Sequence, residues 1–323
     1  MIKERLLNAF RNVSFNLKQA YDVCPEVNPE SVRARIYENL GIAFQRIGKG
    51  IYIAQDCVLI EGDGRDLSFL ENESIDAIIT DHPWMDTKAN KGGNRNFATY
   101  DCFQYTPEDF EEKARVMRDG GFLVEMLPAE NESNYEYLYQ IKKMAEAAGF
   151  QYYAKVPWVK GTFVANTGRK AKNSEDVMIF SKGKPRALKP DKQRGVVDGV
   201  PTRFMSGTNG MLPTDFNVQA VPKKQQISQS EKPVALVEQL LDFITKENEL
   251  VLDQFAGSGV VGLACKNKNR QCILIEKDTE KVKRIAERIR ATVVEVTATV
   301  STALSDTQSA LIENEYGQLS FAV

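Results

Sequence analysis

Short apolar runs alternate with amphipathic helical patterns along most of the chain, and this alternation is the strongest constraint on its fold. From about residue 58 the apolar runs have the length of buried strands, and the segments between them carry apolar residues at helical spacing. Strands that alternate with helices are typical of an α/β fold, a largely parallel sheet covered by helices. The predicted strands are 57–61, 75–80, 121–127, 150–158, 176–181, 249–254 and 271–276, and the predicted helices are 107–118, 133–148, 232–246, 259–268 and 279–292.

The first 55 residues have a different pattern. Apolar residues follow helical spacing from residue 2 to residue 20, "NPESVRARIYENLG" predicts a second helix, and "IAFQRIGKGIYIA" alternates around two glycines as a hairpin does. Helices followed by a basic-tipped hairpin are similar to a winged-helix DNA-binding unit. The alternative is a unit that only packs against the main domain. The basic residues on the predicted recognition helix and wing are Arg33, Arg35, Arg46 and Lys49.

The pattern divides the chain into five parts. Residues 1–55 form the small helical unit, and residues 56–181 form the first half of the α/β domain. Residues 182–228 interrupt the alternation with proline, glycine and basic residues, and they predict an insertion that carries recognition loops. Residues 229–295 complete the α/β domain. Residues 296–323 form a tail with β-branched stretches and no motif.

Composition excludes several classes of protein. No apolar run approaches the roughly 18 residues that cross a bilayer, and the amphipathic start lacks the apolar core of a signal peptide, so we expect a cytoplasmic protein. The five cysteines are scattered and His82 is the only histidine. A zinc site, a Cys–His nucleophile and a Ser-His-Asp triad all need more partners than this, so no metal site is predicted.

Positive charge is concentrated in one segment. Residues 151–224 hold fourteen Lys and Arg against five Asp and Glu, although the whole chain has a net charge of −2. Short basic runs are usually solvated surface, but an excess over more than seventy residues favours a polyanionic partner. The candidates for phosphate contacts are Lys160, Arg169, Lys170, Lys172, Arg186, Arg194 and Arg203.

A glycine-rich turn follows the strand at 249–254. Gly257, Gly259 and Gly262 have G-x-G-x-x-G spacing, and Glu276 ends the next strand nineteen residues after Gly257. This pattern predicts a nucleoside across the turn with its ribose on the glutamate. Asp253 just before the turn is unfavourable for a pyrophosphate and favours a cofactor with positive charge. S-adenosylmethionine is therefore favoured over NAD, which stays the alternative.

A second polar cluster follows the apolar strand in "DAIITDHPW". Asp81, His82, Pro83 and Trp84 stand where that strand ends, so the strand delivers an acid, a stiffened backbone and a large aromatic to the rim of the sheet.

Together these segments resemble the amino-group DNA methyltransferases, which methylate N6 of adenine or N4 of cytosine. The tetrapeptide comes first and the glycines last, as in their β class, whose target-recognition region lies between them. "MRDGGFLVEMLP" and "NSEDVMIFSKG" are similar to intervening family motifs, and the resemblance covers roughly 57–292. It implies a Rossmann-like, mostly parallel seven-stranded methyltransferase sheet with helices on both faces, S-adenosyl-L-methionine as cofactor and double-stranded DNA as substrate. Relatives of this class often dimerise, and many are paired with a restriction enzyme.

The resemblance also implies roles for individual residues. Asp63 matches a residue at the adenine edge of the cofactor, which is the favoured reading, and a helix cap in "GDGRDLS" is the close alternative. Lys232-Pro233 matches the start of the helix beside the cofactor's amino-acid end. The implied catalytic residues are Asp81, His82, Pro83 and Trp84, and the implied cofactor-binding residues are Asp63, Lys232, Pro233, Asp253, Phe255, Ala256, Gly257, Gly259 and Glu276.

The chemistry explains this residue combination. The exocyclic amine of a nucleobase is a poor nucleophile because its lone pair is delocalised into the ring. Asp81 and the backbone carbonyl of residue 82 would hold the amino hydrogens and free that pair. Trp84 would stack on a base flipped out of the duplex. Methyl transfer is then mainly a matter of alignment.

His82 departs from the family pattern, which has proline at this position. Proline fixes φ near −65° and histidine does not, but any residue presents a carbonyl, and Pro83 still favours an extended residue 82. We therefore expect activity to survive, with His82 as a spacer that presents its carbonyl. A proton-transfer role for the imidazole is the alternative.

Three functional alternatives remain at this stage. The target is adenine N6 or cytosine N4, and an aspartate at position 81 favours adenine slightly. An inactive DNA-binding regulator with a winged-helix unit and an NAD-dependent oxidoreductase are alternatives from other classes.

Overall fold

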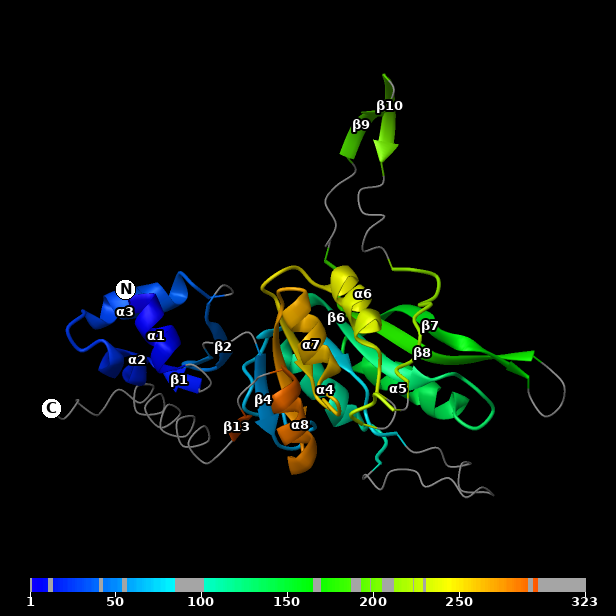
Figure 1. The fold of residues 1–323 in the computed structure, drawn as a ribbon, viewed down its shortest axis with the longest axis horizontal. Coiled ribbons are helices and arrows are strands. Elements are labelled where there is room, and N and C mark those ends of the chain that lie inside the picture. Colours follow the sequence, from blue (N-terminus) through cyan, green and yellow to red (C-terminus); the bar gives the residue numbers. More distant parts are fainter. Residues whose placement is uncertain are drawn as a thin grey trace.

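The computed structural model of the 323-residue chain is shown in Figure 1. The structure describes residues 2–10, 14–40, 43–53, 57–84, 102–164, 170–186, 193–197, 199–204, 212–222, 224–228, 231–289 and 293–295. The tail at 296–323 and Arg169 therefore lie outside the described residues.

One large sheet forms the centre of the molecule. Its eight strands have the order β13-β4-β12-β11-β5-β6-β8-β7, and neighbours from β13 to β6 are parallel while β8 and β7 are antiparallel. All seven predicted strands are present, and a three-residue strand adds to one edge. The strands are β4 (Cys57–Glu61), β5 (Ile75–Thr80), β6 (Met117–Pro128), β7 (Phe150–Val164), β8 (Lys170–Lys182), β11 (Leu250–Asp253), β12 (Gln271–Glu276) and β13 (Val293–Glu295).

Helices cover both faces of this sheet, as predicted. Successive residues of a strand point to opposite faces, so Ile273 and Leu274 belong to different apolar cores. Burial on both faces explains why β5, β11 and β12 are continuous apolar runs. One core includes residues of α6 (Val234–Ile244), α7 (Val260–Asn267) and α8 (Thr279–Ile289), and the other includes residues of α4 (Pro107–Val116) and α5 (Tyr135–Ala147).

Two antiparallel strands are longer than the sequence indicated. The prediction ended the first strand at residue 158 and began the second at 176, but β7 and β8 stay paired from Phe150–Lys182 out to Val164–Lys170. The outer part of this ladder, residues 159–164 and 170–175, contains many polar residues. An apolar pattern therefore detects only the inner half.

The N-terminal unit has its own small core and a winged-helix-like element order. It contains three helices and a three-stranded antiparallel sheet of order β1-β3-β2. Figure 1 shows it beside the large sheet, on the side of β13 and β4. Its elements are α1 (Ile2–Ala9), β1 (Ser14–Asn16), α2 (Leu17–Val23), α3 (Pro29–Tyr37), β2 (Gln45–Gly48) and β3 (Ile51–Ile53).

The helical pattern predicted over residues 2–20 is interrupted, which corrects the sequence reading. Asn16 and Gln19 form a capping box. The Asn16 side chain accepts a hydrogen bond from the Gln19 N–H at 2.9 Å, and the Gln19 side chain accepts one from the Asn16 N–H at 2.8 Å. This cap starts α2 and leaves Ser14–Asn16 free to pair with β3 as β1. The apolar residues on either side still share one core, which is why their spacing looked continuous.

The segment predicted as an irregular insertion contains a hairpin. Strands β9 (Gln193–Val197) and β10 (Val200–Phe204) pair antiparallel, and Figure 1 shows them projecting away from the large sheet. The chain then returns to the sheet at Phe216, which is fully buried. Its N–H donates to the Pro157 carbonyl and its carbonyl accepts from the Val159 N–H, both at 2.8 Å. The insertion is thus anchored to β7.

No helix among the described residues is long and apolar enough to cross a membrane.

Candidate active site

The predicted site residues collect at one edge of the sheet. Parallel strands end on the same side, so β5, β11 and β12 bring Asp81, Asp253 and Glu276 together there. Strands β5 and β11 are direct neighbours, with Ala77 opposite Val251. The tetrapeptide and the glycine turn, far apart in sequence, therefore begin side by side.

Asp81 lies in a chain of alternating charges. Its carboxylate contacts the Lys232 ammonium, which also lies 3.3 Å from a Glu175 oxygen, and Glu175 in turn contacts Lys160. Burial raises the pKa of Asp81, against the opposing effect of Lys232. Burial alone would lower the pKa of Lys232, but the two carboxylates outweigh it and raise this pKa. Lys232 is therefore a buried cation that joins the Asp81 carboxylate to the start of α6.

The backbone of the tetrapeptide is held by two hydrogen bonds. The Trp84 N–H donates to the His82 carbonyl at 2.8 Å, and the Phe103 N–H donates to the Pro83 carbonyl at 3.0 Å. A carbonyl oxygen has two lone pairs, so the His82 carbonyl keeps one for a further donor. Trp84 is partly exposed.

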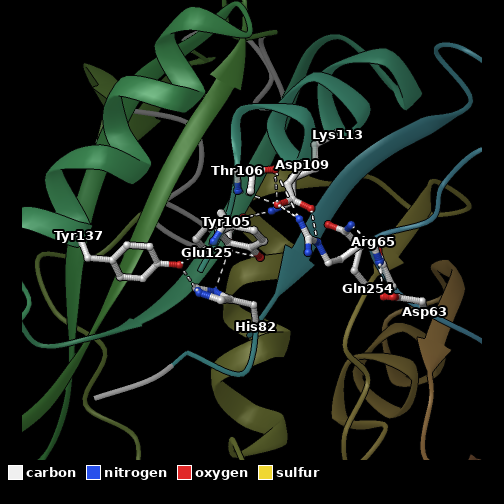
Figure 2. A network of polar contacts seen from close by, with 11 residues as sticks. Asp63, Arg65, His82, Tyr105, Thr106, Asp109, Lys113, Glu125, Tyr137 and Gln254 are labelled. Carbon is white, nitrogen blue, oxygen red and sulfur yellow. Dashed lines mark hydrogen bonds and ion pairs between the residues drawn. The ribbon is translucent and has the colours of Figure 1, made fainter. Parts of the chain in front are cut away.

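The His82 side chain lies in a buried polar cluster with Tyr137 and Glu125 (Figure 2). Its Nε2 lies 2.7 Å from the Tyr137 hydroxyl, and its Nδ1 lies 4.0 Å from a Glu125 oxygen. Glu125 also accepts from Lys113 at 2.5 Å and from the Tyr105 hydroxyl at 3.1 Å. Burial lowers the pKa of His82 well below its usual range, and Lys113 lowers it further.

The glycine turn forms a left-handed corner closed by Glu276. Gly257 and Gly259 have φ of +53° and +72°, a conformation that favours glycine. The Gly257 N–H donates to Glu276 at 2.8 Å, and the Asp278 N–H donates to the other carboxylate oxygen at 3.0 Å. The third glycine of the motif serves packing instead, because a Cβ at Gly262 would lie 2.7 Å from Leu274.

Asp253 is a buried carboxyl group beside this corner. It accepts from the Phe255 N–H at 3.1 Å. Burial raises the pKa of Asp253 to about 8, and the nearby carboxylates of Asp81 and Glu276 raise it as well. A cation bound at the corner would relieve that repulsion, so this buried acid suits a positively charged ligand better than a phosphate.

The loop after β4 packs directly on the corner. The Gly64 carbonyl accepts from the Gln254 side chain at 2.7 Å, and a Cβ at Gly64 would lie only 1.8 Å from the Gln254 carbonyl oxygen. Asp63 is exposed and accepts from the Arg65 N–H at 3.0 Å, so in this structure it caps the turn, and its contact with a cofactor stays a prediction.

Several residues at this edge were missed by the sequence analysis. Arg65 binds Asp109 through two hydrogen bonds of 2.7 and 2.8 Å, and its guanidinium lies 4.9 Å from the Phe103 ring centre. In the polar cluster around His82, the missed residues are Tyr105, Lys113, Glu125 and Tyr137. In the chain of alternating charges that starts at Asp81, the missed residue is Glu175. Glu125 alone had a signal, as an acid in the middle of the apolar strand "GFLVEMLP".

The predicted DNA-binding residues have different environments. Arg33 and Arg35 are half-exposed on α3, each near a glutamate one turn away. Arg186 binds Glu249 through bonds of 2.8 and 2.7 Å, which indicates a structural role, and Lys160 is engaged with Glu175. Arg194 and Arg203 are opposite each other in the β9–β10 register, and the backbones of Lys170 and Lys172 lie in β8.

Within the described part of the chain, no cluster of three or more His, Cys, Asp or Glu residues could hold a metal ion.

Comparisons with known proteins agree with this geometry. The family model for N6 and N4 methyltransferases, described as DNA methylase, matches residues 75–288. Type II methyltransferase M.HpaI of Haemophilus parainfluenzae is 27% identical over 229 residues, which are 69% of this chain and 70% of that protein. Type II methyltransferase M.HindIII of Haemophilus influenzae is 49% identical over 49 residues, 15% of this chain and 16% of that protein.

Two solved structures share the fold. TTHA0409 of Thermus thermophilus, in complex with S-adenosyl-L-methionine, has a TM-score of 0.51 at 16% identity and covers 74% of this chain and 98% of its own. The PvuII DNA methyltransferase, described as cytosine-N4-specific, has a TM-score of 0.52 at 17% identity and covers 72% of this chain and 86% of its own.

Proposed function

The chain belongs to the N6/N4 DNA methylase family, and on that premise we propose that it transfers a methyl group to N6 of adenine in double-stranded DNA. The methyl donor is S-adenosyl-L-methionine, which supplies an electrophilic methyl group on a sulfonium when it is bound.

The observation that carries the proposal is the junction between Asp81 and the glycine corner. Asp81 and Asp253 end neighbouring strands, and Lys232 contacts Asp81 from the start of α6. A base amine held by Asp81 would therefore lie next to a ligand seated on Gly257 and Glu276. This adjacency is what a direct transfer between two bound molecules requires.

The cofactor fits the residues at the corner. The buried carboxyl of Asp253 favours a cation, and the carboxylate of Glu276 suits ribose hydroxyls. Phe255 and Ala256 would line the corner, and Lys232-Pro233 would lie at the amino-acid end. Asp63 would reach the adenine edge. Together these assignments predict that every residue in contact with the cofactor lies at the edge of the sheet formed by the C-terminal ends of the parallel strands.

Asp81 would activate the amine without being consumed. Its carboxylate accepts one amino hydrogen, and the free lone pair of the His82 carbonyl accepts the other. The nitrogen then forms its bond to the methyl carbon while the carbon–sulfur bond breaks, and one amino proton leaves. The raised pKa of Asp81 suits it to take up that proton. Trp84 would stack on the flipped base.

The DNA would contact two parts of the chain. We propose that residues 1–55 form a DNA-binding unit and that residues 182–228 form the target-recognition segment, with Arg194 and Arg203 on its hairpin. Lys170 and Lys172 on β8, together with Arg169, would add phosphate contacts. A homodimer, pairing with a restriction enzyme and a cytoplasmic location are further parts of this proposal.

Adenine is proposed over cytosine because an aspartate opens the tetrapeptide. Long-read sequencing of DNA from cells that express the protein tests this choice directly, since it identifies the modified base and its sequence context. We expect N6-methyladenine at one motif, and none in cells that express Asp81→Ala. N4-methylcytosine at a motif would replace adenine with the second candidate.

An in vitro assay tests the reaction itself. Purified protein, labelled S-adenosylmethionine and unmethylated DNA should give labelled DNA, and Asp81→Ala should lower turnover by at least about a thousandfold. DNA binding without any transfer by the unaltered protein would instead support the inactive regulator, and binding of NAD without S-adenosylmethionine would support the oxidoreductase.

A further inference from the structure

The His82 imidazole is buried at a position where the family motif has proline. Its side chain is fully buried and its ring centre lies 4.0 Å from that of Tyr105. Both ring nitrogens face polar groups of distant elements, Tyr137 on α5 and Glu125 on β6 (Figure 2). The ring is therefore enclosed by the protein, and with a side-chain exposure of 0% it offers no surface to a bound substrate.

The hydrogen bonds around this ring assign its tautomer. The Tyr137 oxygen already accepts the Tyr105 N–H at 3.1 Å, so its own hydrogen needs an acceptor, and His82 Nε2 lies 2.7 Å away. If Nε2 accepts, the ring hydrogen is on Nδ1, where the nearest carboxylate, that of Glu125, lies 4.0 Å away and beyond hydrogen-bond distance. The opposite tautomer would leave the tyrosine hydrogen without this acceptor and turn the Nδ1 lone pair toward an anion.

We propose that His82 is a positioning residue, held as a neutral imidazole with hydrogen on Nδ1, and that its bond to Tyr137 fixes the tetrapeptide backbone where the family motif uses proline. The proposal rests on the proposed function, because the positioned groups are the Asp81 carboxylate and the His82 carbonyl. Tyr137 acts through His82, and the Lys113–Glu125 pair lies beside the ring without a hydrogen bond to it.

The anchor compensates for a lost constraint. Proline restricts φ by its ring, whereas histidine leaves φ free, so a loop with histidine needs tertiary contacts to reach the same order. Such contacts reach His82 from β6 and α5, since Glu125 is opposite Thr80 in the sheet and Tyr137 lies in the first turn of the helix. Histidine at this position therefore substitutes a side-chain anchor for a backbone restriction.

Nuclear magnetic resonance tests the tautomer without any activity. The chain has one histidine, so untagged protein labelled with ¹⁵N-histidine gives signals from a single imidazole. We expect the neutral Nδ1–H form, and we expect Tyr137→Phe to change the Nε2 signal. Tyr139→Phe, which removes an exposed hydroxyl from the same helix, is the control. A charged ring or the Nε2–H form at neutral pH would overturn the proposal.

Two substitutions separate positioning from packing. His82→Ala and His82→Pro both remove the ring and its bond to Tyr137, but only proline restores the φ restriction. We expect turnover of His82→Pro to exceed that of His82→Ala by about fivefold or more, an effect of the size of one hydrogen bond, with KM for DNA changed less than kcat. Equal turnover of the two folded variants would overturn the positioning role.

A double-mutant cycle identifies the path of the effect. Tyr137→Phe should lower kcat about fivefold in the unaltered chain and should have almost no effect in the His82→Ala background. Equal effects in both backgrounds would show that Tyr137 acts through its bond with Tyr105 instead. If the unaltered protein methylates no DNA, the proposed function fails, whereas the tautomer result still stands or falls alone.

Discussion

At the scale of single residues, the environment of each charged group decides what it can do. Lys232 and Lys113 are both buried lysines, but the first faces two carboxylates at the strand edge and the second pairs with one carboxylate beneath it. The first joins Asp81 at the end of β5 to the start of α6. The second holds Glu125 beside His82. Their sequence neighbourhoods do not distinguish these roles.

Asp253 gives a prediction about pH. Its pKa is about 8 in the folded protein and near the ordinary 3.8 in the unfolded chain. Between these two pH values the carboxyl of Asp253 keeps its proton in the folded state and loses it in the unfolded state. The free energy of unfolding therefore falls as the pH rises from about 4 to about 8. The Asp253→Asn variant has no proton to lose at this position, so its free energy of unfolding does not fall in this way. The free energy of unfolding of the variant, minus that of the unaltered protein, should therefore increase from about pH 4 to about pH 8.

Urea unfolding at a series of pH values measures this difference. Gln151→Ala, a substitution at an exposed position of β7 that involves no titratable group, is the control and should leave the pH profile unchanged. A difference between Asp253→Asn and the unaltered protein that does not vary with pH would contradict the assigned pKa.

At the scale of elements, the corner is built by loops that pack on each other at the ends of parallel strands. The loop after β4 contacts the loop after β11 backbone to backbone at Gly64 and Gln254. This approach leaves no space for a side chain at Gly64. The same approach explains how "EGDG", far from the glycine turn in sequence, becomes part of the same site.

Gly64→Ala should destabilise the protein by about 3 kcal/mol, because the new Cβ would lie 1.8 Å from a backbone oxygen that cannot move independently. Gly62→Ala is a matched control from the same loop, since its Cβ would meet only Ile60 at 3.8 Å. Chemical denaturation measures both variants, and affinity for S-adenosylmethionine should fall with Gly64→Ala. Equal stability of the two variants would show that the corner is less tightly packed than described.

At the scale of the whole molecule, the chain joins a small winged-helix-like unit to a large α/β domain. Arg46 on β2 forms an ion pair of 2.9 Å with Glu71 in the large domain, and Ile51 of β3 packs with the core under the sheet. The sequence predicts Arg46 as a basic residue of the wing. In the structure its ion pair with Glu71 joins the small unit to the large domain. Arg33 and Arg35 on α3 remain the half-exposed basic pair of the unit.

Replacing Arg33 and Arg35 together with glutamate should weaken DNA binding about tenfold or more at moderate salt. The slope of log affinity against log salt should fall by about 1 for each lost phosphate contact. Fluorescence anisotropy across a salt series measures both quantities. Lys283→Glu on α8, an exposed lysine outside this unit, is the control. An unchanged slope would show that the unit only packs against the main domain.

Local signals in the sequence determined the outline of this protein. The apolar runs identified seven of the eight strands of the large sheet, and the glycines with Glu276 located the corner. The letters "DHPW" located the polar cluster at the end of β5. These features depend on neighbours within a few residues or on one strand–turn–helix unit, so they leave a pattern that can be read along the chain. The outer β7–β8 ladder left a weaker pattern because polar residues are frequent along it.

Only the tertiary structure decided which side chains meet. Lys232 contacts Asp81 across 151 residues, Arg65 contacts Asp109 across 44, and His82 contacts Tyr137 across 55. Such contacts form because parallel strands end at the same edge and helices pack over them. The sequence around one partner does not indicate which distant residue it will contact. The physical reason is the same in each case: chemistry at a sheet edge is assembled from chain segments that are neighbours in space alone.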